Sequence, residues 1–318
     1  MEGKNQSSVN EFILLGFSDL GKLQDLLFIV FLIMYVLTLL GNISIITIIR
    51  TDPHLHTPMY YFLSNLSIID LCCSSTITPK ALTNFKVEKK TISLLECAIQ
   101  MFSLVTMATA ECFLLAVMAY DRYVAICNPL LYTVLMTRKV CLQLVMSTYI
   151  ISMLFSFIHT GNVFSMTFCG SNVINHFCCD LPPLLNLSCS DTFSNQVVLN
   201  TFAGIVGTVT VTAICVSYTY IISAILRIRS SEGRQKAFST CTSHFITVTL
   251  FFGTLIFIYV IPTSSYSLNI NRVVSVVYTM VIPMVNPMIY SFRNNDVKKA
   301  LKKSLGEKMF LLNKEFLL

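Results

Sequence analysis

The sequence predicts an all-α membrane protein, a bundle of seven transmembrane helices with its N-terminus outside, its C-terminus inside and a short amphipathic helix after the seventh span. Of its 318 residues, 54% are hydrophobic and only 12% are charged, about half the charged share of a soluble domain. The apolar residues form long blocks, and lysine and arginine are divided unevenly between the segments that separate them. This composition excludes a disordered protein and argues against a soluble enzyme.

The first apolar block covers residues 26–49 and contains no charged residue. A helix of that length extends for about 36 Å, and the hydrocarbon core of a bilayer is about 30 Å thick. No basic start or small-residue cleavage site precedes the block, so we expect it to stay in the mature chain. The other six spans are expected at residues 58–79, 98–121, 140–160, 197–226, 237–262 and 272–292. All are too long for the strands of a membrane barrel.

The orientation follows from the basic residues. With the N-terminus outside, fifteen of the twenty-two lysines and arginines face inward, and none occurs between Lys139 and Arg227, a stretch that includes the second outer loop. This asymmetry predicts that the N-terminus is outside and the C-terminus inside. The chain then divides into an extracellular tail (1–25), the bundle (26–292) and a cytoplasmic amphipathic helix and tail (293–318). Topology explains the basic inner face, so no nucleic-acid partner is expected.

The segment after the last span is amphipathic, and its basic residues are expected to contact membrane lipids. Its apolar positions are Val297, Ala300, Leu301, Ser304 and Leu305, and its basic positions are Lys298, Lys299, Lys302 and Lys303.

Cysteines and sequons agree with this sidedness. Five cysteines lie at or near the outer face, where disulfides persist, and an odd number leaves one unpaired. They are Cys97, Cys169, Cys178, Cys179 and Cys189. Glycosylation sequons begin at Asn5 in the outer tail and at Asn186 in the second outer loop.

Two acidic residues, Asp70 and Glu111, lie deep inside the predicted bilayer, where carboxylates are costly and indicate function. They are about 18 Å and 16 Å from the inner ends of spans 2 and 3, hence at nearly one level. Asn42 and Asn286 on spans 1 and 7 complete a polar cluster. One interpretation is a Na⁺ or proton site that biases a conformational equilibrium, with Na⁺ the one cofactor considered. The other is a hydrogen-bond network that only stabilises the bundle.

Several motifs occur in a fixed order along the spans. MAYDRYVAIC (118–127) ends span 3, and PMYYFLSNLS (58–67) begins span 2. Ser217-Tyr218 lies in span 5, KAFSTC (236–241) begins span 6, and NPMIY (286–290) ends span 7. As an ordered set on seven spans, these motifs make residues 10–305 similar to the odorant (olfactory) receptor family of rhodopsin-like G-protein-coupled receptors.

The resemblance implies roles for particular residues. Cys97 would bond to Cys179, and Cys169 to Cys189. The family more often has an aromatic residue where Cys178 stands, so Cys178 is a second candidate partner for Cys97 and the pairing stays open. The resemblance also implies coupling to a stimulatory olfactory-type G protein, which raises cyclic AMP. The implied switch for that coupling consists of Asp121, Arg122, Tyr123, Tyr218 and Tyr290.

The resemblance also places four helix faces around a ligand, although periodicity alone would make them ordinary core stripes. These faces consist of Leu104, Val105, Ala108, Thr109, Cys112, Phe202, Ala203, Val206, Gly207, Phe252, Leu255, Ile256, Tyr259, Val276 and Thr279. The set is mostly apolar, with Thr109 and Tyr259 as its main hydroxyl groups, and it contains no charged residue. We therefore expect a small, neutral, mostly apolar volatile as the ligand.

Other classes of function were weighed against this reading. An enzyme is not expected, because no phosphate loop, metal-ligand cluster or nucleophile–base set is found. A transporter or channel would use Asp70 and Glu111, but the odd number of spans and the lack of an inverted repeat oppose it. A receptor for an endogenous metabolite outside the nose stays open. By resemblance, the expected location is the plasma membrane of sensory neuron cilia.

Overall fold

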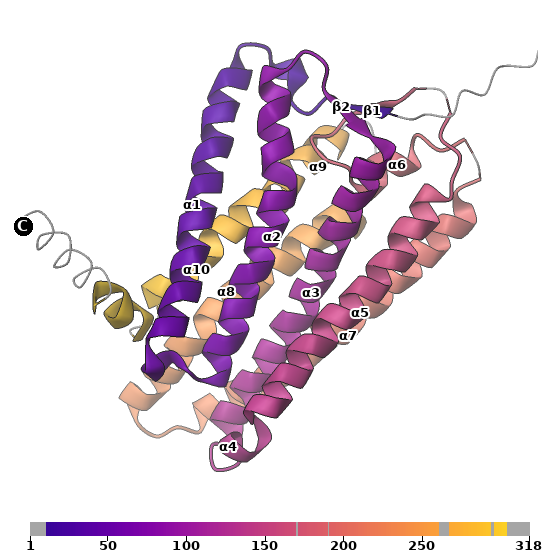
Figure 1. The fold of residues 1–318 in the computed structure, drawn as a ribbon. Helices are drawn as coiled ribbons and strands as arrows, with labels where there is room; N and C mark the ends of the chain where they lie inside the picture. The colour runs from indigo at the N-terminus through magenta and orange to yellow at the C-terminus, as the bar shows by residue number, and fades with distance from the viewer. Residues whose placement is uncertain (1–10, 170, 190, 261–266, 294–295, 304–318) are drawn as a thin grey trace, which may run out of the picture.

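A computed structural model describes residues 11–169, 171–189, 191–260, 267–293 and 296–303. Figure 1 shows an elongated bundle of long helices, with strands β1 and β2 at one end and α4 at the other. The long helices are α1 (Leu23–Thr51), α2 (Pro58–Lys86), α3 (Leu94–Cys127), α5 (Arg138–Phe164), α7 (Phe193–Leu226) and α8 (Ser231–Val260), followed by the consecutive segments α9 (Ser267–Val276), η3 (Val277–Val281) and α10 (Ile282–Arg293). We name the two ends of the bundle the strand end and the α4 end.

Five of the described helical segments are long and apolar enough to cross a membrane. They are α1, α3, α5, α7 and the segment Ile270–Ser291, which runs from α9 into α10. Helix α8 contributes a shorter apolar part, Cys241–Phe257. Helix α2 is rich in buried serine, threonine and asparagine, which lowers its hydropathy. Each expected span coincides with a helix, except that residues 261–262 of the sixth lie outside the described residues.

The helix ends follow local chemistry. Ser93 and Glu96 form a reciprocal capping box at the start of α3, with N–H to side-chain oxygen distances of 3.2 and 3.0 Å. Pro58 begins α2, where the missing N–H would have no helical partner. The short helices α4 (Tyr132–Leu135), α6 (Leu181–Leu185), η1 (Ser18–Leu20) and η2 (Pro53–Leu55) lie in the connections.

The seventh span is not a uniform α-helix. Residues Val277–Val281 form a π-helical segment, η3, and Tyr278, Thr279 and Met280 within it are buried. A π-helical turn contains more residues than an α-helical one, so it changes which side chains face the interior. Hydrophobic periodicity did not predict this interruption.

Residues 11–14 of the N-terminal segment form a strand, where the sequence predicts only a tail. Strand β1 (Glu11–Leu14) pairs antiparallel with β2 (Thr91–Ser93) and parallel with β3 (Val173–Ile174). Phe12 and Leu14 are completely buried on one side of β1. Alternating apolar residues thus attach residues 11–14 to the bundle.

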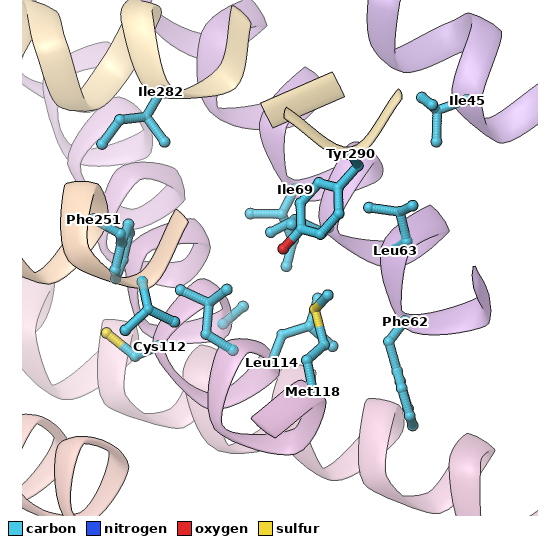
Figure 2. Packing of buried hydrophobic residues seen from close by; sticks show 14 of the residues in the cluster. Ile45, Phe62, Leu63, Ile69, Cys112, Leu114, Met118, Phe251, Ile282 and Tyr290 are labelled. Atoms are coloured by element: carbon cyan, nitrogen blue, oxygen red, sulfur yellow. The ribbon is translucent and has the colours of Figure 1, made fainter. Parts of the chain in front are cut away.

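Two hydrophobic clusters hold the molecule together. The larger extends through the bundle, and Figure 2 shows Phe62, Leu114, Met118, Phe251 and Tyr290 among its members. The smaller, which we call the strand-end cluster, consists of Phe12, Leu14, Ile92, Cys97, Met101, Val163, Met166, Phe168, Ile174, Cys179, Leu181, Leu184 and Leu199.

Residues 296–303 are helical, with Val297 and Ala300 buried and Lys298, Lys299, Lys302 and Lys303 exposed. Ser304 and Leu305, which the sequence places on the apolar side, lie outside the described residues.

Candidate functional site

A cavity of ≈ 780 Å³ lies among α3, α5, α7, α8 and η3, with Leu181 of α6 at its strand end. This volume is within the range of about 300–1,000 Å³ that is common for sites of small molecules. Its lining consists of Leu104, Val105, Ala108, Thr109, Cys112, Phe155, His159, Leu181, Leu199, Asn200, Ala203, Gly204, Val206, Gly207, Thr208, Val211, Thr212, Phe252, Leu255, Ile256 and Tyr278. No lysine, arginine, aspartate or glutamate is among these described lining residues.

The cavity brings together eleven of the fifteen residues that the sequence suggested. These are Leu104, Val105, Ala108, Thr109, Cys112, Ala203, Val206, Gly207, Phe252, Leu255 and Ile256. They come from three helices that are far apart in the sequence. Four suggested residues are not in the lining that the structure describes.

Each of those four has a separate explanation. The Phe202 ring packs edge to face on Phe155 at 5.2 Å, so Phe155 meets the cavity instead. Val276 and Thr279 are displaced from the lining, and Tyr278 lies there, because η3 alters the helical period. The Thr279 hydroxyl donates a hydrogen bond to the Ser275 carbonyl at 2.7 Å. The side chain of Tyr259 lies outside the described residues.

The cavity also has polar lining that the sequence reading missed. His159 and Phe155 lie one turn apart on α5, a helix that was not considered, although their i, i+4 spacing gives them a common face. Asn200 and Tyr278 add an amide and a phenol. No sequence pattern indicated Leu181, because this residue reaches the cavity from the short helix α6 in the connection between α5 and α7. The cavity is therefore richer in hydrogen-bonding groups than expected.

Next to the main core, Asp70 and Asn286 form a buried polar pair. The Asn286 amide donates to both Asp70 carboxylate oxygens, at 3.2 and 3.1 Å. Glu111 is buried nearby and interacts electrostatically with Asp70, and its Oε1 accepts no hydrogen bond from the residues that are described. Asn42 instead donates to the Pro283 carbonyl at 2.9 Å, which ties α1 to α10.

These acidic groups do not form a multi-ligand metal centre. In the described part of the chain, no three His, Cys, Asp or Glu side chains gather as a metal ligand set. The two carboxylates and the uncoordinated Glu111 oxygen offer oxygen ligands of the kind that a hard cation prefers. They also suit a shared proton, because two close carboxylates repel when both are ionised.

At the α4 end, Asp121 accepts a hydrogen bond from the Tyr132 hydroxyl at 2.9 Å. Among the described residues, Asp121 is hydrogen-bonded to Tyr132 and is not in an ion pair with the adjacent Arg122. Arg122 is half-buried, and its charge acts electrostatically on Tyr218 and Tyr290. Tyr123 instead packs against Tyr220 of α7, with ring centroids 5.7 Å apart.

His244 connects three helices in this region, a role that the sequence reading missed. Its Nε2 lies 3.1 Å from the Leu115 carbonyl of α3, and its Nδ1 lies 2.7 Å from the Tyr218 hydroxyl of α7. Because a carbonyl only accepts, Nε2 must carry the proton. In the neutral ring, Nδ1 then accepts from the Tyr218 hydroxyl, which also lies 3.3 Å from the Cys241 carbonyl. The buried His244 of α8 is thereby fixed to α3 and α7 at once.

Two disulfides lie at the strand end. Cys97 of α3 is bonded to Cys179 with a Cα–Cα distance of 5.5 Å, and Cys169 is bonded to Cys189 at 5.7 Å. Cys178, the other candidate partner of Cys97, is a buried free thiol. The structure thus assigns the bond to Cys179.

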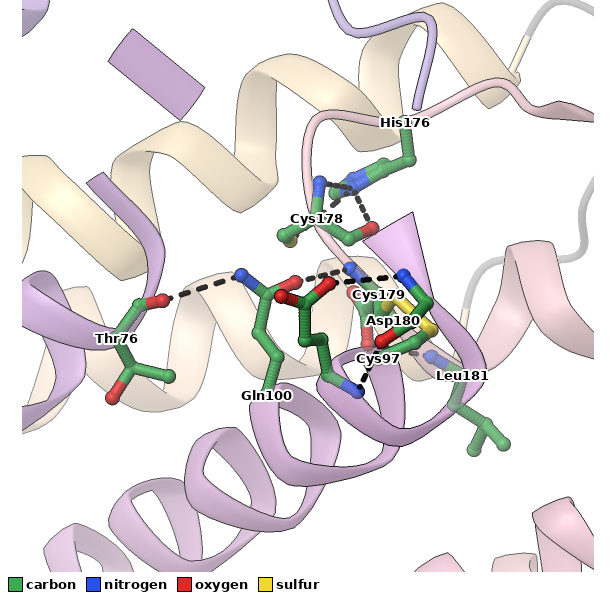
Figure 3. The surroundings of a disulfide bond; sticks show 10 residues. Thr76, Cys97, Gln100, His176, Cys178, Cys179, Asp180 and Leu181 are labelled. Carbon is green, nitrogen blue, oxygen red and sulfur yellow. Dashed lines mark hydrogen bonds between the residues drawn. A yellow bond between two sulfur atoms is a disulfide. The ribbon is translucent and has the colours of Figure 1, made fainter. Parts of the chain in front are cut away.

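Figure 3 shows how Gln100 supports this connection. Its Oε1 accepts the Cys179 N–H at 2.9 Å, and its Nε2 donates to the Thr76 carbonyl of α2 at 3.2 Å. Beside it, the Cys178 thiol lies 3.3 Å from His176 Nδ1, and burial raises the pKa of that thiol well above its ordinary value. The loop that contains these residues is therefore attached to both α2 and α3.

Arg272, the first residue of the seventh expected span, is also part of the strand end. Its guanidinium is almost completely buried and donates to both Asp19 carboxylate oxygens at 3.1 Å, and to the Gly16 carbonyl. The hydrogen bond from Arg272 lowers the pKa of Asp19. This pair fixes the N-terminal segment to α9.

The apolar helices indicate a multi-pass membrane protein, and its internal cavity has a volume that is common for sites of small molecules. A family model described as "Olfactory receptor" matches residues 31–308. The chain is 51% identical to Olfactory receptor 5G3 of Homo sapiens over 314 residues, which cover 99% of this chain and 100% of that relative. It is 54% identical to Olfactory receptor 8U3 of Mus musculus over 303 residues, 95% of each chain.

A third relative, Olfactory receptor-like protein OLF1 of Canis lupus familiaris, is 53% identical over 309 residues, covering 97% of this chain and 99% of that one. The chain therefore belongs to the olfactory receptor family. As a member, it is a G-protein-coupled receptor and not an enzyme.

Proposed function

We propose that this odorant receptor binds small, neutral, mostly apolar volatiles in the ≈ 780 Å³ cavity and activates a stimulatory olfactory-type G protein, which raises cyclic AMP. The observation that supports this most directly is the lining itself. Its described residues are mostly apolar, include no ionised side chain, and surround a volume suited to a small molecule.

The chemistry of the lining sets the ligand class. A carboxylate or an ammonium group would lose its hydration without gaining a counter-charge, which disfavours it. Thr109, His159, Asn200 and Tyr278 provide hydrogen-bonding groups of both kinds. We infer that the ligand has one or two polar atoms, such as those of an alcohol, ketone or ester.

We further propose that Arg122 is the switch toward the G protein, together with Asp121, Tyr123, Tyr218 and Tyr290. The link between Tyr218, His244 and the Leu115 carbonyl supports this, because it joins α7, α8 and α3 at the same level of the bundle. We propose that activation moves the α4 end of α8 away from α3, which would break this link.

The proposed topology has seven spans, with the strand end outside and the α4 end inside. Both disulfides are at the strand end, which agrees with an oxidising exterior. Asn186 is exposed there and is the proposed glycosylation site, while Asn5 lies outside the described residues. The lysine-bearing helix 296–303 would rest on lipid at the inner surface, and the proposed location is the cilia of sensory neurons.

For Asp70 and Glu111 we propose a site for Na⁺ or a proton that favours one state of the receptor. The unpartnered Glu111 oxygen supports this over a purely structural network, because a completed network would satisfy it. Asn286 would position Asp70, and Asn42 would act indirectly through α10.

The test of the main proposal is a cyclic AMP assay in cells that also contain the stimulatory olfactory-type G protein. Neutral volatiles are compared with matched acids and amines. We expect responses to neutral compounds, abolished in Arg122→Ala at equal surface amounts, and a shift in potency in Thr109→Val because a ligand partner is lost.

Two other outcomes would contradict the proposal. Charged acids as best agonists, with matched esters silent, would overturn the ligand class. Ion currents without cyclic AMP would favour a channel or transporter that uses Asp70 and Glu111. Expression outside the nose, with responses to a metabolite, would keep the receptor mechanism but change its physiological role.

A further inference from the structure

At the strand end, the cavity borders the strand-end cluster. Leu181 and Leu199 line the cavity and also belong to the strand-end cluster, together with β1 residues Phe12 and Leu14. The Cys97–Cys179 bond lies within the same cluster. The described residues at this end therefore form an apolar, cross-linked roof between the cavity and the strands.

The side of the cavity between α7 and α8 is built differently. On α7, the buried residues Leu199, Val206 and Thr210 mark the face toward α3. Successive helical residues are about 100° apart, so Thr208 and Thr212 are roughly opposite that face. Both are exposed, yet both line the cavity. A lining that extends around α7 to its outward face means that the cavity is open at the side of the bundle.

Glycines occur on both helices near this opening. Gly204 lines the cavity on α7, and Gly253 is exposed on α8, one turn before the exposed lining residue Ile256. A Cβ atom added at Gly204 or Gly253 would meet nothing within 4 Å. We call this place the lateral opening and define it by Gly204, Thr208 and Thr212 of α7 with Gly253 and Ile256 of α8.

The surroundings of the lateral opening are those of a lipid-facing surface. Residues 197–226 and 237–260 contain no arginine, lysine, aspartate or glutamate. Thr208 and Thr212 are near the middle of α7, which is long and apolar enough to cross a membrane. In a bilayer, the lateral opening thus faces hydrocarbon and not water.

We propose that the ligand reaches the cavity from the hydrocarbon core of the membrane through the lateral opening between α7 and α8. This inference rests on the proposed function, because it takes the cavity as the ligand site. A neutral apolar compound concentrates in the bilayer, so this route begins where the ligand is most abundant. The hydroxyl groups of Thr208 and Thr212 can accept or donate hydrogen bonds to its polar atom on the way.

The experiment uses the full chain in lipid nanodiscs with bromobenzene as the probe. The chain has no tryptophan, so Val105→Trp places a single indole on α3 in the cavity, where a bound heavy atom quenches its fluorescence. Stopped-flow mixing gives the rates of binding and release, and a titration gives Kd. This readout needs no G protein.

The test variant carries Gly253→Leu, which adds a side chain on α8 beside the exposed lining residue Ile256 and alters no residue that lines the cavity. We expect binding and release to slow by about tenfold each, with Kd unchanged, because a route alters rates and not the end states. Gly161→Leu on α5 is the matched control, since its Cβ also meets nothing within 4 Å and it does not line the cavity. Leucine favours helix over glycine, so the variants should fold.

Unchanged rates with normal quenching would overturn the lateral route and leave the cavity as the ligand site. A weakened Kd with an unaltered binding rate would also overturn it, since the added leucine would then act inside the site. No quenching in the Val105→Trp parent would overturn both the route and the proposed ligand site. Slowing by Gly161→Leu to the same extent would show a general effect on the bilayer and reject the route.

Discussion

The buried surroundings of His176, in the loop beside Cys178 and Cys179, determine its protonation state. His176 is buried, its ring stacks on Phe177 at 4.6 Å, and its Nδ1 lies 3.3 Å from the Cys178 amide nitrogen and 3.2 Å from the Cys178 carbonyl oxygen. Burial lowers the pKa of His176, an effect that the nearby Asp180 and the Cys178 carbonyl oppose and Arg272 reinforces. Because burial is the largest of these effects, the folded chain favours the neutral ring.

This environment predicts a loss of stability on mild acidification. Below the unfolded pKa, about 6.5, the unfolded chain binds a proton that the folded chain resists, so stability falls as the pH decreases toward the folded pKa. We expect the melting temperature to drop between pH 7.5 and 5.5 in the parent and to drop less in His176→Phe, both measured in the same detergent. An equal drop in both chains would contradict this assignment.

Among the elements, α8 is held to its neighbours by a polar link as well as by packing. His244 accepts from Tyr218 of α7 at 2.7 Å and donates to the Leu115 carbonyl of α3 at 3.1 Å. A hydrogen bond typically contributes about 1 kcal/mol, and breaking the link leaves buried polar groups unpaired. The link therefore favours the state in which α8 lies against α3.

Removing this link should raise basal signalling. Tyr218→Phe leaves the ring stacked on His244 but deletes the donor, and a loss of about 1 kcal/mol would increase the active population about fivefold when that population is small. Basal cyclic AMP at equal surface amounts measures this. Thr219→Val, next to it on the exposed side of α7, is the control and should have no effect. Lower basal activity in Tyr218→Phe would instead give Tyr218 a role in the active state.

For the whole molecule, the strand end combines distant parts of the chain in one unit. Strand β1, the start of α3, the loop around Cys179 and Arg272 of α9 meet there. Two disulfides reinforce this unit, one between residues 82 apart and the other between residues 20 apart.

The two disulfides should differ in their effect on stability. A cross-link reduces the freedom of the unfolded chain more when it closes a longer loop, which makes the Cys97–Cys179 bond more stabilising by about 1 kcal/mol. The variant Cys97→Ser with Cys179→Ser should thus melt at a lower temperature than Cys169→Ser with Cys189→Ser. Far-ultraviolet dichroism of the purified proteins measures both. The reverse order would indicate that local contacts, and not loop length, determine the effect.

The sequence by itself determined the long helices and the buried acidic residues, because both depend on the local apolar period and on the cost of burying charge. Periodicity makes the faces of α3, α7 and α8 core stripes, and the family resemblance is what assigns them to a ligand site. The sequence could not determine the shift at Val276 and Thr279, because a π-helical turn changes the period without a clear apolar signal.

Only the tertiary structure decided which chain segments meet. Adjacent cysteines are equivalent in a sequence, and the choice of Cys179 over Cys178 depends on how the loop lies on Gln100. Contacts between distant residues also determine the pairing of β1 with β3. The same holds for the link from His244 to two other helices and for the lateral opening. Such contacts are fixed by how whole helices pack, and a local pattern does not encode them.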